Sequence, residues 1–179
     1  MRKNVNLISK LGDHGTSSLF SGERVSKSSL RIETLGDLDE LGAVLGVARC
    51  YVQKERIKKE LLDLQRKLFV LGSELATTDD TPLSRRVDDA FLEEFEQTVQ
   101  ALQDVTRIKE GFSLSGDSIP AAYLNHARTV ARRVERHAVN LFEQKELQNQ
   151  NILAFLNRLS VYLYIMARFE DPNPTMLKP

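Results

Sequence analysis

The sequence predicts an all-α protein: a bundle of five helices with the up-down arrangement of ferritin-like proteins, preceded by an N-terminal loop. Three observations support this fold class. Apolar residues recur at alternating spacings of three and four in five segments, none of the five prolines falls inside those segments, and no strand-like alternation competes with them. The 179 residues suffice for a single domain over 1–179, which we divide into a loop over 1–30 and a bundle over 37–170.

The first two helices are expected over 37–54 and 55–76. In the first, Asp37 and Glu40 have the spacing of a capping box, in which the two side chains bond each other's backbone amides. The second carries the clearest apolar stripe in the chain, made of Ile57, Leu61, Leu64, Leu68, Leu71 and Leu75. An uninterrupted stripe of this kind is typical of the seam of a helical bundle.

The other three helices are expected over 88–108, 120–142 and 151–169. The first of these has the weakest pattern of the five, and Ser118 followed by Pro120 marks the start of the next. The segment TTDDTPLSRR at 77–86 is expected to be a linker, and GFSLSGDSIP at 111–120 breaks the helical pattern.

Composition excludes several classes of protein. Lys+Arg and Asp+Glu each number 25, whereas a general nucleic-acid binder is usually visibly basic. The single cysteine, Cys50, excludes an internal disulfide framework and fits a reducing compartment. The N-terminus has no apolar signal region, and no later window is expected to reach transmembrane length. We therefore expect a cytoplasmic protein that binds neither nucleic acid nor membrane.

A dense arginine cluster stands out against this neutral balance, in the stretch HARTVARRVERH at 126–137. Three of its arginines stack at i, i+4 and i+8 on a helix, where like charges repel. Arg132 and Glu135 can pair at i, i+3, whereas Arg128 and Arg136 have no obvious helical partner. Planar guanidinium groups suit bidentate contacts with phosphate or carboxylate. The cluster therefore indicates a small anionic ligand or an ion pair between subunits, with a solvated basic face as the alternative. Its arginines are Arg128, Arg132, Arg133 and Arg136.

Four other features are weaker candidates. The glycines and hydroxyls of 10–18 could wrap phosphates through backbone amides, although they lack the Walker spacing and would otherwise form a flexible arm. Asp39 falls in the first turn of its expected helix, where it would complement the helix dipole. Phe112 reads on sequence alone as an ordinary core aromatic, and Asn157 could face the arginines. The three histidines have no metal-ligand spacing, so no protein metal site is expected.

Several motifs occur together and in a fixed order along nearly the whole chain. They are SKLGDHGTSSLFSGERVSK at 9–27, RIETLGDLDELGAVLGVAR at 31–49, FSLSG at 112–116, HARTVARRVER at 126–136, LNRLS at 156–160 and YLYIMAR at 162–168. In these motifs the sequence resembles the PduO-type ATP:cob(I)alamin adenosyltransferases, also called corrinoid adenosyltransferases.

The resemblance implies a homotrimer of five-helix bundles with active sites between subunits. It implies transfer of the 5′-deoxyadenosyl group of ATP to Co(I) of reduced cobalamin, with release of triphosphate and formation of adenosylcobalamin. ATP is then the co-substrate, cob(I)alamin the substrate and Mg²⁺ the accompanying ion. A cobalamin reductase and adenosylcobalamin-dependent enzymes are the partners implied.

The resemblance also implies roles for individual residues. Asn157 would contact the nucleotide, Arg128 would pair with Asp39 of a neighbouring subunit, and Phe112 would press against the lower face of the corrin. The triphosphate and its Mg²⁺ would be held by Arg132, Arg133, Glu135 and Arg136. The ATP loop would be formed by Ser9, Lys10, Leu11, Gly12, Ser17, Ser18 and Lys27.

The sequence departs from the family pattern at three places. Val161 stands where an Asp commonly follows N-R-L-S, the usual L-P-G-G is replaced by LSGD with Ser115 and Asp117, and Leu11 replaces a Thr or Asn. The missing carboxylate at Val161 motivates an alternative function, a catalytically weakened escort that binds ATP and cobalamin. A plain bundle scaffold, with the arginines at an oligomer interface, is a third hypothesis.

Overall fold

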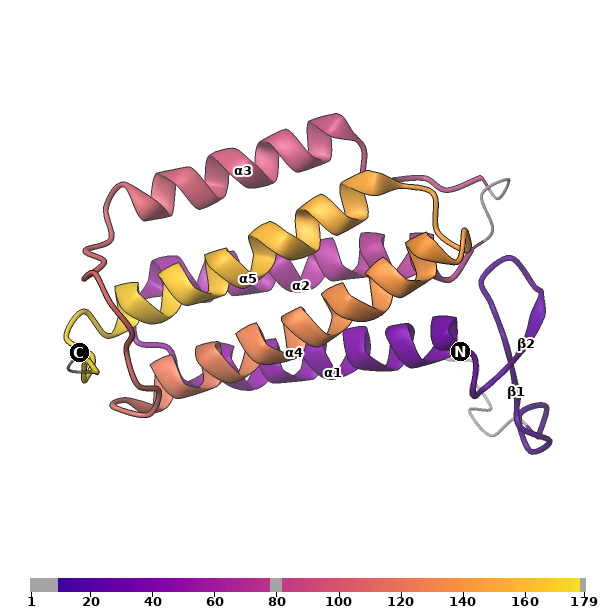
Figure 1. Ribbon diagram of the computed structural model, residues 1–179, viewed down its shortest axis with the longest axis horizontal. Helices are drawn as coiled ribbons and strands as arrows, with labels where there is room; N and C mark the ends of the chain where they lie inside the picture. The colour runs from indigo at the N-terminus through magenta and orange to yellow at the C-terminus, as the bar shows by residue number, and fades with distance from the viewer. Residues whose placement is uncertain (1–9, 78–81, 178–179) are drawn as a thin grey trace, which may run out of the picture.

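Five long helices lie side by side in an elongated bundle, as the computed structural model shows (Figure 1). The structure describes residues 10–77 and 82–177, so Ser9 lies outside the described residues. The predicted fold class is confirmed. The helices are α1 (Leu30–Tyr51), α2 (Glu55–Leu75), α3 (Asp89–Gln103), α4 (Ile119–Glu143) and α5 (Gln150–Glu170).

The core forms where the predicted stripes meet. Every member of the α2 stripe is buried, from Ile57 to Leu75, and α1 and α4 contribute their expected apolar faces. Helix α5 lies at the centre and contacts α4, α3 and α2. It is buried on more than the one face that the sequence predicted, with Phe155, Tyr162 and Met166 all inside. Burial on several faces is expected for the central helix of a bundle.

One prediction about α5 was wrong, namely that no segment of the chain reaches transmembrane length. Helix α5 is long and apolar enough to cross a membrane by length and composition, contrary to the expectation that no window reaches that length. In the structure 61% of that window is buried inside the protein. Because most apolar residues of α5 are covered by other helices, they are accounted for by the bundle core.

Helix α1 begins earlier than predicted. Ser29 is its N-cap, and the Ser29 hydroxyl accepts a hydrogen bond from the amide of Ile32 at 3.4 Å. The predicted start at Asp37, with Asp37 and Glu40 as a capping box, is wrong because both residues lie within the helix. The added turns also place Asp39 in the interior of α1, so it does not complement the dipole at the helix start.

Helix α3 ends at Gln103, short of the predicted 108. The Thr106 hydroxyl donates to the carbonyl of Leu102 at 2.6 Å, and the amide of Val105 also turns back to that carbonyl at 3.3 Å. Val105 and Thr106 are both β-branched, which disfavours continuation of the helix, so α3 ends in this short turn. Helix α4 begins as expected, after Ser118 and with proline in its first turn.

The N-terminal region contains a small hairpin that the sequence analysis did not predict. Strand β1 (Thr16–Ser18) pairs antiparallel with β2 (Arg24–Ser26), beyond the start of α1 at the right of Figure 1. Strands of three residues are too short to display a recognisable alternation. Between them, Gly22 has a φ of 88°, a conformation that favours glycine.

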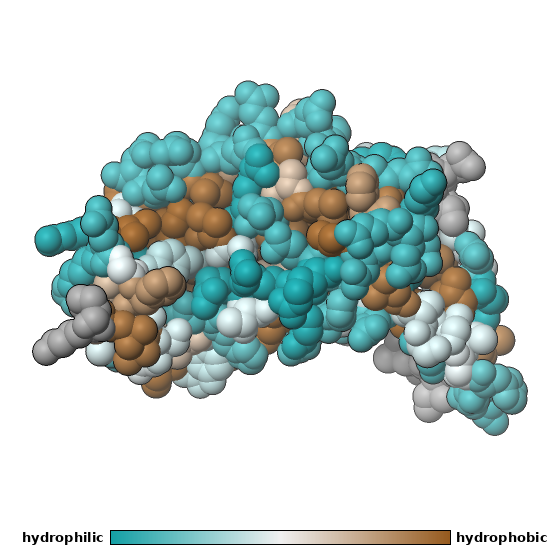
Figure 2. Space-filling model, in the orientation of Figure 1, coloured by the Kyte–Doolittle hydropathy of each residue, from teal (hydrophilic) through white to brown (hydrophobic). Residues whose placement is uncertain are grey.

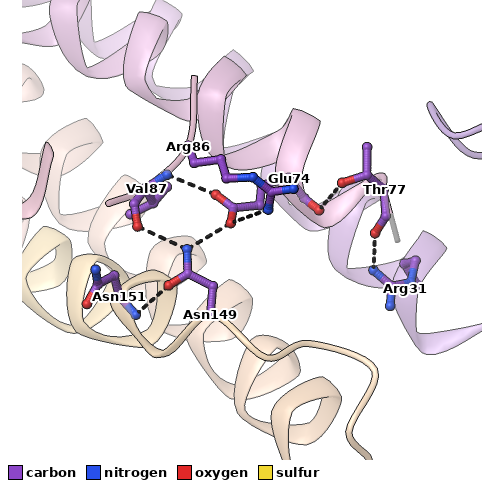
Figure 3. Close-up of polar contacts among 7 residues, drawn as sticks. All are labelled: Arg31, Glu74, Thr77, Arg86, Val87, Asn149 and Asn151. Carbon is purple, nitrogen blue, oxygen red and sulfur yellow. Dashed lines mark hydrogen bonds and ion pairs between the residues drawn. The ribbon is translucent and has the colours of Figure 1, made fainter. Parts of the chain in front are cut away.

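A buried polar cluster fixes the end of the bundle nearest the hairpin (Figure 3). The Glu74 carboxylate accepts hydrogen bonds from the amide of Val87 at 2.9 Å, from Arg86 at 3.2 Å and from Asn149 at 2.8 Å. Buried Arg31 donates to the carbonyl of Leu75 at 2.8 Å. These contacts join the end of α2 to the segment before α3, to the N-cap of α5 and to α1.

Candidate functional site: an arginine face on α4 and an N-terminal hairpin

The middle of α4 carries two cations, Arg132 and Arg136, that no carboxylate of the described residues neutralises. Within 10–77 and 82–177, the exposed guanidinium of Arg132 makes no hydrogen bond or ion pair, so the expected pair with Glu135 is not formed. Arg136 donates only to the backbone carbonyl of Arg132, at 3.0 Å. A strongly hydrophilic band runs along this part of α4 (Figure 2). Such a face is suited to an external anion.

Glu135 instead contacts the neighbouring helix. Its carboxylate accepts a hydrogen bond from the amide nitrogen of Asn157 on α5, at 3.1 Å. The structure thus brings Asn157 beside the arginine face, as expected from the sequence. The contact fixes the amide of Asn157 so that its oxygen remains available as an acceptor.

Arg133 faces α1 rather than the open side. Its Nε lies 3.0 Å from Asp37 Oδ1, and the guanidinium also donates to Glu40. His137 Nδ1 lies 2.9 Å from Asp37 Oδ2, although the two are not aligned as a hydrogen bond. Sequence analysis missed Asp37 and Glu40 as ion-pair partners, because both had been placed at a helix start.

Arg128 and Asp39 are not brought together within one chain. Arg128 Nε donates to the Asn125 side chain at 3.3 Å, and no carboxylate contacts it in the described part of the chain. Asp39 is exposed and lines an apolar pocket of about 450 Å³ between α1 and α2. The nearby Phe69 is 80% exposed. A large exposed aromatic beside an apolar pocket is typical of an interaction surface.

The N-terminal candidates gather around the hairpin. A Cβ placed on Gly12 would lie 3.1 Å from the ammonium of Lys27, so this lysine, which directly follows β2, lies over the glycine turn. Ser17 and Ser18 belong to β1, whereas Lys10 and Leu11 lie in the exposed turn before it.

Arg24 organises this hairpin and was missed by the sequence analysis. Its guanidinium donates to the carbonyl of Leu11 and to the hydroxyls of Thr16 and Ser18, the last at 3.2 Å. These partners are six to thirteen residues away along the chain, and nothing in the sequence indicates which arginine would reach them. The hairpin register, which pairs Ser18 with Arg24, creates the contact.

Phe112 is 80% exposed, so the interpretation as a core aromatic is excluded. It lies in the loop between α3 and α4 and follows Gly111, whose φ is 100°. The amide of Leu177, near the C-terminus, donates to the carbonyl of Phe112 at 2.8 Å. An exposed phenyl ring on a backbone held in this way is suited to an apolar ligand face.

Val161 lies one turn after Asn157 on α5 and is 48% exposed. The departure from the family pattern therefore removes a carboxylate from an accessible position near the arginine face. Among the residues that the structure describes, no group of three side chains that could hold a metal ion occurs. Residues 10–77 and 82–177 alone therefore do not preform a Mg²⁺ site. A Mg²⁺ ion would be held mainly by phosphate oxygens, and Glu135 is the acidic side chain of α4 that lies between Arg132 and Arg136 in the sequence.

The chain is similar to known proteins along nearly its whole length. The family model for cobalamin adenosyltransferase matches residues 7–170. A corrinoid adenosyltransferase of Citrobacter freundii is 33% identical over 94% of this chain and 96% of its own length. One from Bacillus subtilis is 35% identical over 92% of this chain and 86% of its own. PduO of Salmonella typhimurium is 35% identical, but the chain spans only 50% of that longer protein.

Solved structures extend the match to the fold. A variant PduO-type ATP:corrinoid adenosyltransferase from Lactobacillus reuteri, complexed with cobalamin and ATP, superposes with a TM-score of 0.86 at 27% identity. The alignment covers 97% of this chain and 100% of that one. Another variant of that enzyme, complexed with ATP, gives a TM-score of 0.85 at 28% identity, over 96% of this chain and 100% of that one. With the family model covering most of its length, this chain belongs to the cobalamin adenosyltransferase family.

Proposed function

We propose that this protein transfers the 5′-deoxyadenosyl group of ATP to Co(I) of a reduced corrinoid, forming adenosylcobalamin and triphosphate. One observation carries the proposal: α4 presents Arg132 and Arg136 without carboxylate partners in the described chain, beside the hydrogen-bonded pair of Glu135 and Asn157. This is a site for a polyanionic nucleotide on a chain that belongs to the cobalamin adenosyltransferase family.

The reaction needs positioning and charge stabilisation rather than a general base. Co(I) is the nucleophile, and its electron pair forms the new cobalt–carbon bond at C5′ of ATP. The bond between C5′ and the triphosphate oxygen breaks, and its electron pair leaves with triphosphate, so cobalt is formally oxidised to Co(III). The protein must hold C5′ near cobalt and stabilise the charge that grows on the leaving group.

The arginine face and the hairpin share the nucleotide between them. Arg132 and Arg136 bind the triphosphate, Asn157 contacts the nucleoside, and Glu135 orients Asn157 through the 3.1 Å hydrogen bond. Lys27, Gly12, Ser17 and the other loop residues close over the phosphates through backbone amides and hydroxyls. A bound Mg²⁺ would neutralise part of the phosphate charge. Arg133 instead holds α4 against α1, a role that its contact with Asp37 supports.

Phe112 supplies the corrin side of the site. Its exposed ring occupies the space below the corrin and keeps the lower axial ligand and water away from cobalt, so that Co(I) remains available to C5′. The high exposure of Phe112 supports this role, because a ring that packed in the core could not contact a ligand.

The active sites lie between the subunits of a homotrimer. Arg128 lacks an acidic partner in its own described chain, while Asp39 lies exposed at the rim of an apolar pocket on the α1–α2 face. Pairing Arg128 of one subunit with Asp39 of the next satisfies both and covers the exposed ring of Phe69. Sedimentation analysis should give three chains per particle, and Asp39→Arg should dissociate it.

The direct test is a spectroscopic assay of cobalamin adenosylation. Chemically reduced cob(I)alamin should be consumed only with ATP and Mg²⁺, with appearance of adenosylcobalamin and triphosphate. Absence of product with a protein that binds both ligands would reject this activity. That result would favour a second function, an escort that binds ATP and cobalamin, which is motivated by the exposed Val161 on α5.

The cellular setting follows from the chemistry. The whole chain acts as one catalytic domain in the cytoplasm, where its single cysteine stays reduced. A cobalamin reductase must supply Co(I), and adenosylcobalamin-dependent enzymes receive the product. Co-purification of a reductase activity with the tagged protein from its own cells would test the first of these links.

A further inference from the structure

The loop that carries Phe112 is paired with the C-terminal end of the chain. Ser113 and Met176 form an isolated antiparallel bridge. Around it, the amide of Leu177 donates to the carbonyl of Phe112 and the amide of Leu114 donates to the carbonyl of Thr175, both at 2.8 Å. At the left of Figure 1, the connection from α3 to α4 lies beside the end of α5. The Phe112 loop and the C-terminal segment therefore form a short antiparallel pairing between residues 112–114 and 175–177, which we call the clamp.

Two backbone hydrogen bonds between exposed segments are too few to hold a loop in one place. Asp117 adds two more. One oxygen of its carboxylate accepts the amide of Thr175 at 2.8 Å, and the other accepts the Thr175 hydroxyl at 2.7 Å. Lys109 also reaches Asn173 at 3.3 Å. Asp117 thus makes a charge-assisted, two-point attachment, the strongest side-chain contact between the two segments.

The attachment fixes the part of the loop that presents Phe112. Gly111 and Gly116, with φ of 100° and 120°, bound this segment at conformations that other residues rarely adopt. Met176 packs over the first of them, 3.6 Å from the position of a Cβ on Gly111. Between two flexible glycines, the direction of the Phe112 ring depends on what holds the intervening backbone, and that is the C-terminal segment.

We infer that Asp117 is a positioning residue for the adenosylation reaction. Through its two hydrogen bonds with Thr175 it attaches the C-terminal segment to the Phe112 loop, and this attachment sets the position and direction of the Phe112 ring. The inference rests on the proposed function of Phe112 at the corrin. The hydrogen bonds from Thr175, helped by the charge of Arg168, hold the pKa of Asp117 below its usual value. The carboxylate is therefore charged throughout the neutral range.

The experiment compares Asp117→Ala and Thr175→Val with the wild-type protein, using Thr175→Ser as the conservative variant that keeps the hydroxyl. Hydrogen exchange at the amides of Leu114 and Leu177 should accelerate about tenfold in the first two variants and stay near wild type in the third. In the adenosylation assay, kcat/KM for cob(I)alamin should fall by a similar factor, while KM for ATP should change by less than about twofold. Thr98→Val, on α3, is the matched control and should leave all three quantities unchanged.

Each adverse outcome has a distinct meaning. Unchanged exchange at Leu114 and Leu177 in Asp117→Ala would overturn the clamp. Faster exchange with unchanged corrin kinetics, or an equal rise in KM for ATP, would overturn its role in positioning Phe112. If the wild-type protein makes no adenosylcobalamin, the proposed function fails and the positioning role fails with it, while the exchange result still decides whether the clamp exists.

Discussion

Arg133 Nε lies 3.0 Å from Asp37 Oδ1, whereas the neighbouring guanidinium of Arg132 contacts no acidic group in the described chain. The two arginines are adjacent in the sequence but point to different sides of α4. One is neutralised by α1 and the other is open to an anion from outside. The repulsion expected within the arginine cluster is therefore relieved in two ways, and the two arginines should differ sharply when each is replaced.

Replacing Arg133 by Met should lower stability, because it leaves Asp37 half-buried beside Glu40 without its cation. We expect a loss of about 1–2 kcal/mol in the free energy of unfolding, measured by urea denaturation. Arg132→Met should change that free energy by less than about 0.5 kcal/mol, since its side chain is exposed and unpaired. Turnover should instead fall by at least about 10²-fold in Arg132→Met.

The reverse pattern would contradict this division of roles. If Arg133→Met abolished turnover at full stability, Arg133 would contact the triphosphate in the working enzyme, as the family resemblance first implied. The comparison should be made at saturating ATP and again near KM. Loss of a transition-state contact lowers the turnover rate under both conditions, whereas loss of ground-state binding lowers the rate only when ATP is near KM.

The sequence predicted the helices and their buried stripes because both depend on local periodicity. The α2 stripe from Ile57 to Leu75 is buried as expected. The early start of α1 escaped because residues 30–36 show little apolar periodicity, and their helix depends on the Ser29 cap and on buried Arg31. A helix start that depends on tertiary contacts cannot be predicted from a local sequence pattern.

In the candidate site, too, features that depend on local spacing were predictable, whereas features that depend on helix packing were not. Arginine spacing on α4 predicted a shared face with Asn157 beside it, and the contact of Asn157 with Glu135 shows that Asn157 lies beside α4. The partners of Arg133 and of Arg24 could not be predicted, because they lie 93 or more residues away in the first case and across an unrecognised hairpin in the second. Long-range pairing depends on how the helices pack, which is outside the reach of local spacing.

The contact between Glu135 and Asn157 should appear as energetic coupling in nucleotide binding. Glu135→Gln and Asn157→Ala should each weaken ATP binding, and the double variant should bind no more weakly than the worse single variant. The reason is that Glu135 acts by orienting the Asn157 amide. Calorimetry should give a coupling energy above about 0.5 kcal/mol. Strict additivity would show that the two side chains contact the nucleotide independently.

Gly12→Ala should weaken ATP binding through Lys27. The added methyl would lie 3.1 Å from the Lys27 ammonium, so the lysine must move while the fold is unaffected. We expect about a fivefold rise in the Kd for ATP, with no change in the thermal unfolding midpoint of the free protein. In a Lys27→Ala background the same glycine substitution should have little further effect. A full additional loss there would mean that ATP itself needs the space over Gly12.

Glu74 should be important for stability but not for catalysis. Its buried carboxylate accepts hydrogen bonds from Val87, Arg86 and Asn149, so removing it leaves several donors without an acceptor (Figure 3). Glu74→Ala should cost about 3 kcal/mol in urea denaturation. At a temperature where the variant remains folded, kcat and both KM values should match those of the wild type. A selective loss of activity would indicate that this end of the bundle also shapes the site.

Stability should vary with pH through the pair of Lys67 and Glu94, which ties α2 to α3. Lys67 Nζ lies 2.6 Å from Glu94 Oε1, and this hydrogen bond, together with the charge of Lys67, lowers the pKa of Glu94 below 4.5. Because the pKa is lowered by folding, the contribution is present above the unfolded pKa and is lost as pH falls through the folded one.

Glu94→Gln should therefore be less stable than the wild type by no more than about 1 kcal/mol at neutral pH, since Glu94 is largely exposed and Lys67 keeps Asp63 at 3.4 Å. The difference should shrink as the pH falls below 4.5. The matched control is Glu93→Gln, which removes an adjacent carboxylate of α3 that forms no ion pair in the described chain and should not alter the pH dependence. If the stability difference between Glu94→Gln and the wild type stayed constant as the pH falls, the charge pair would not be what holds α3 to α2. The packing of Lys67 over Phe91, with Nζ 5.0 Å from the ring centre, would then be the contact that holds the two helices.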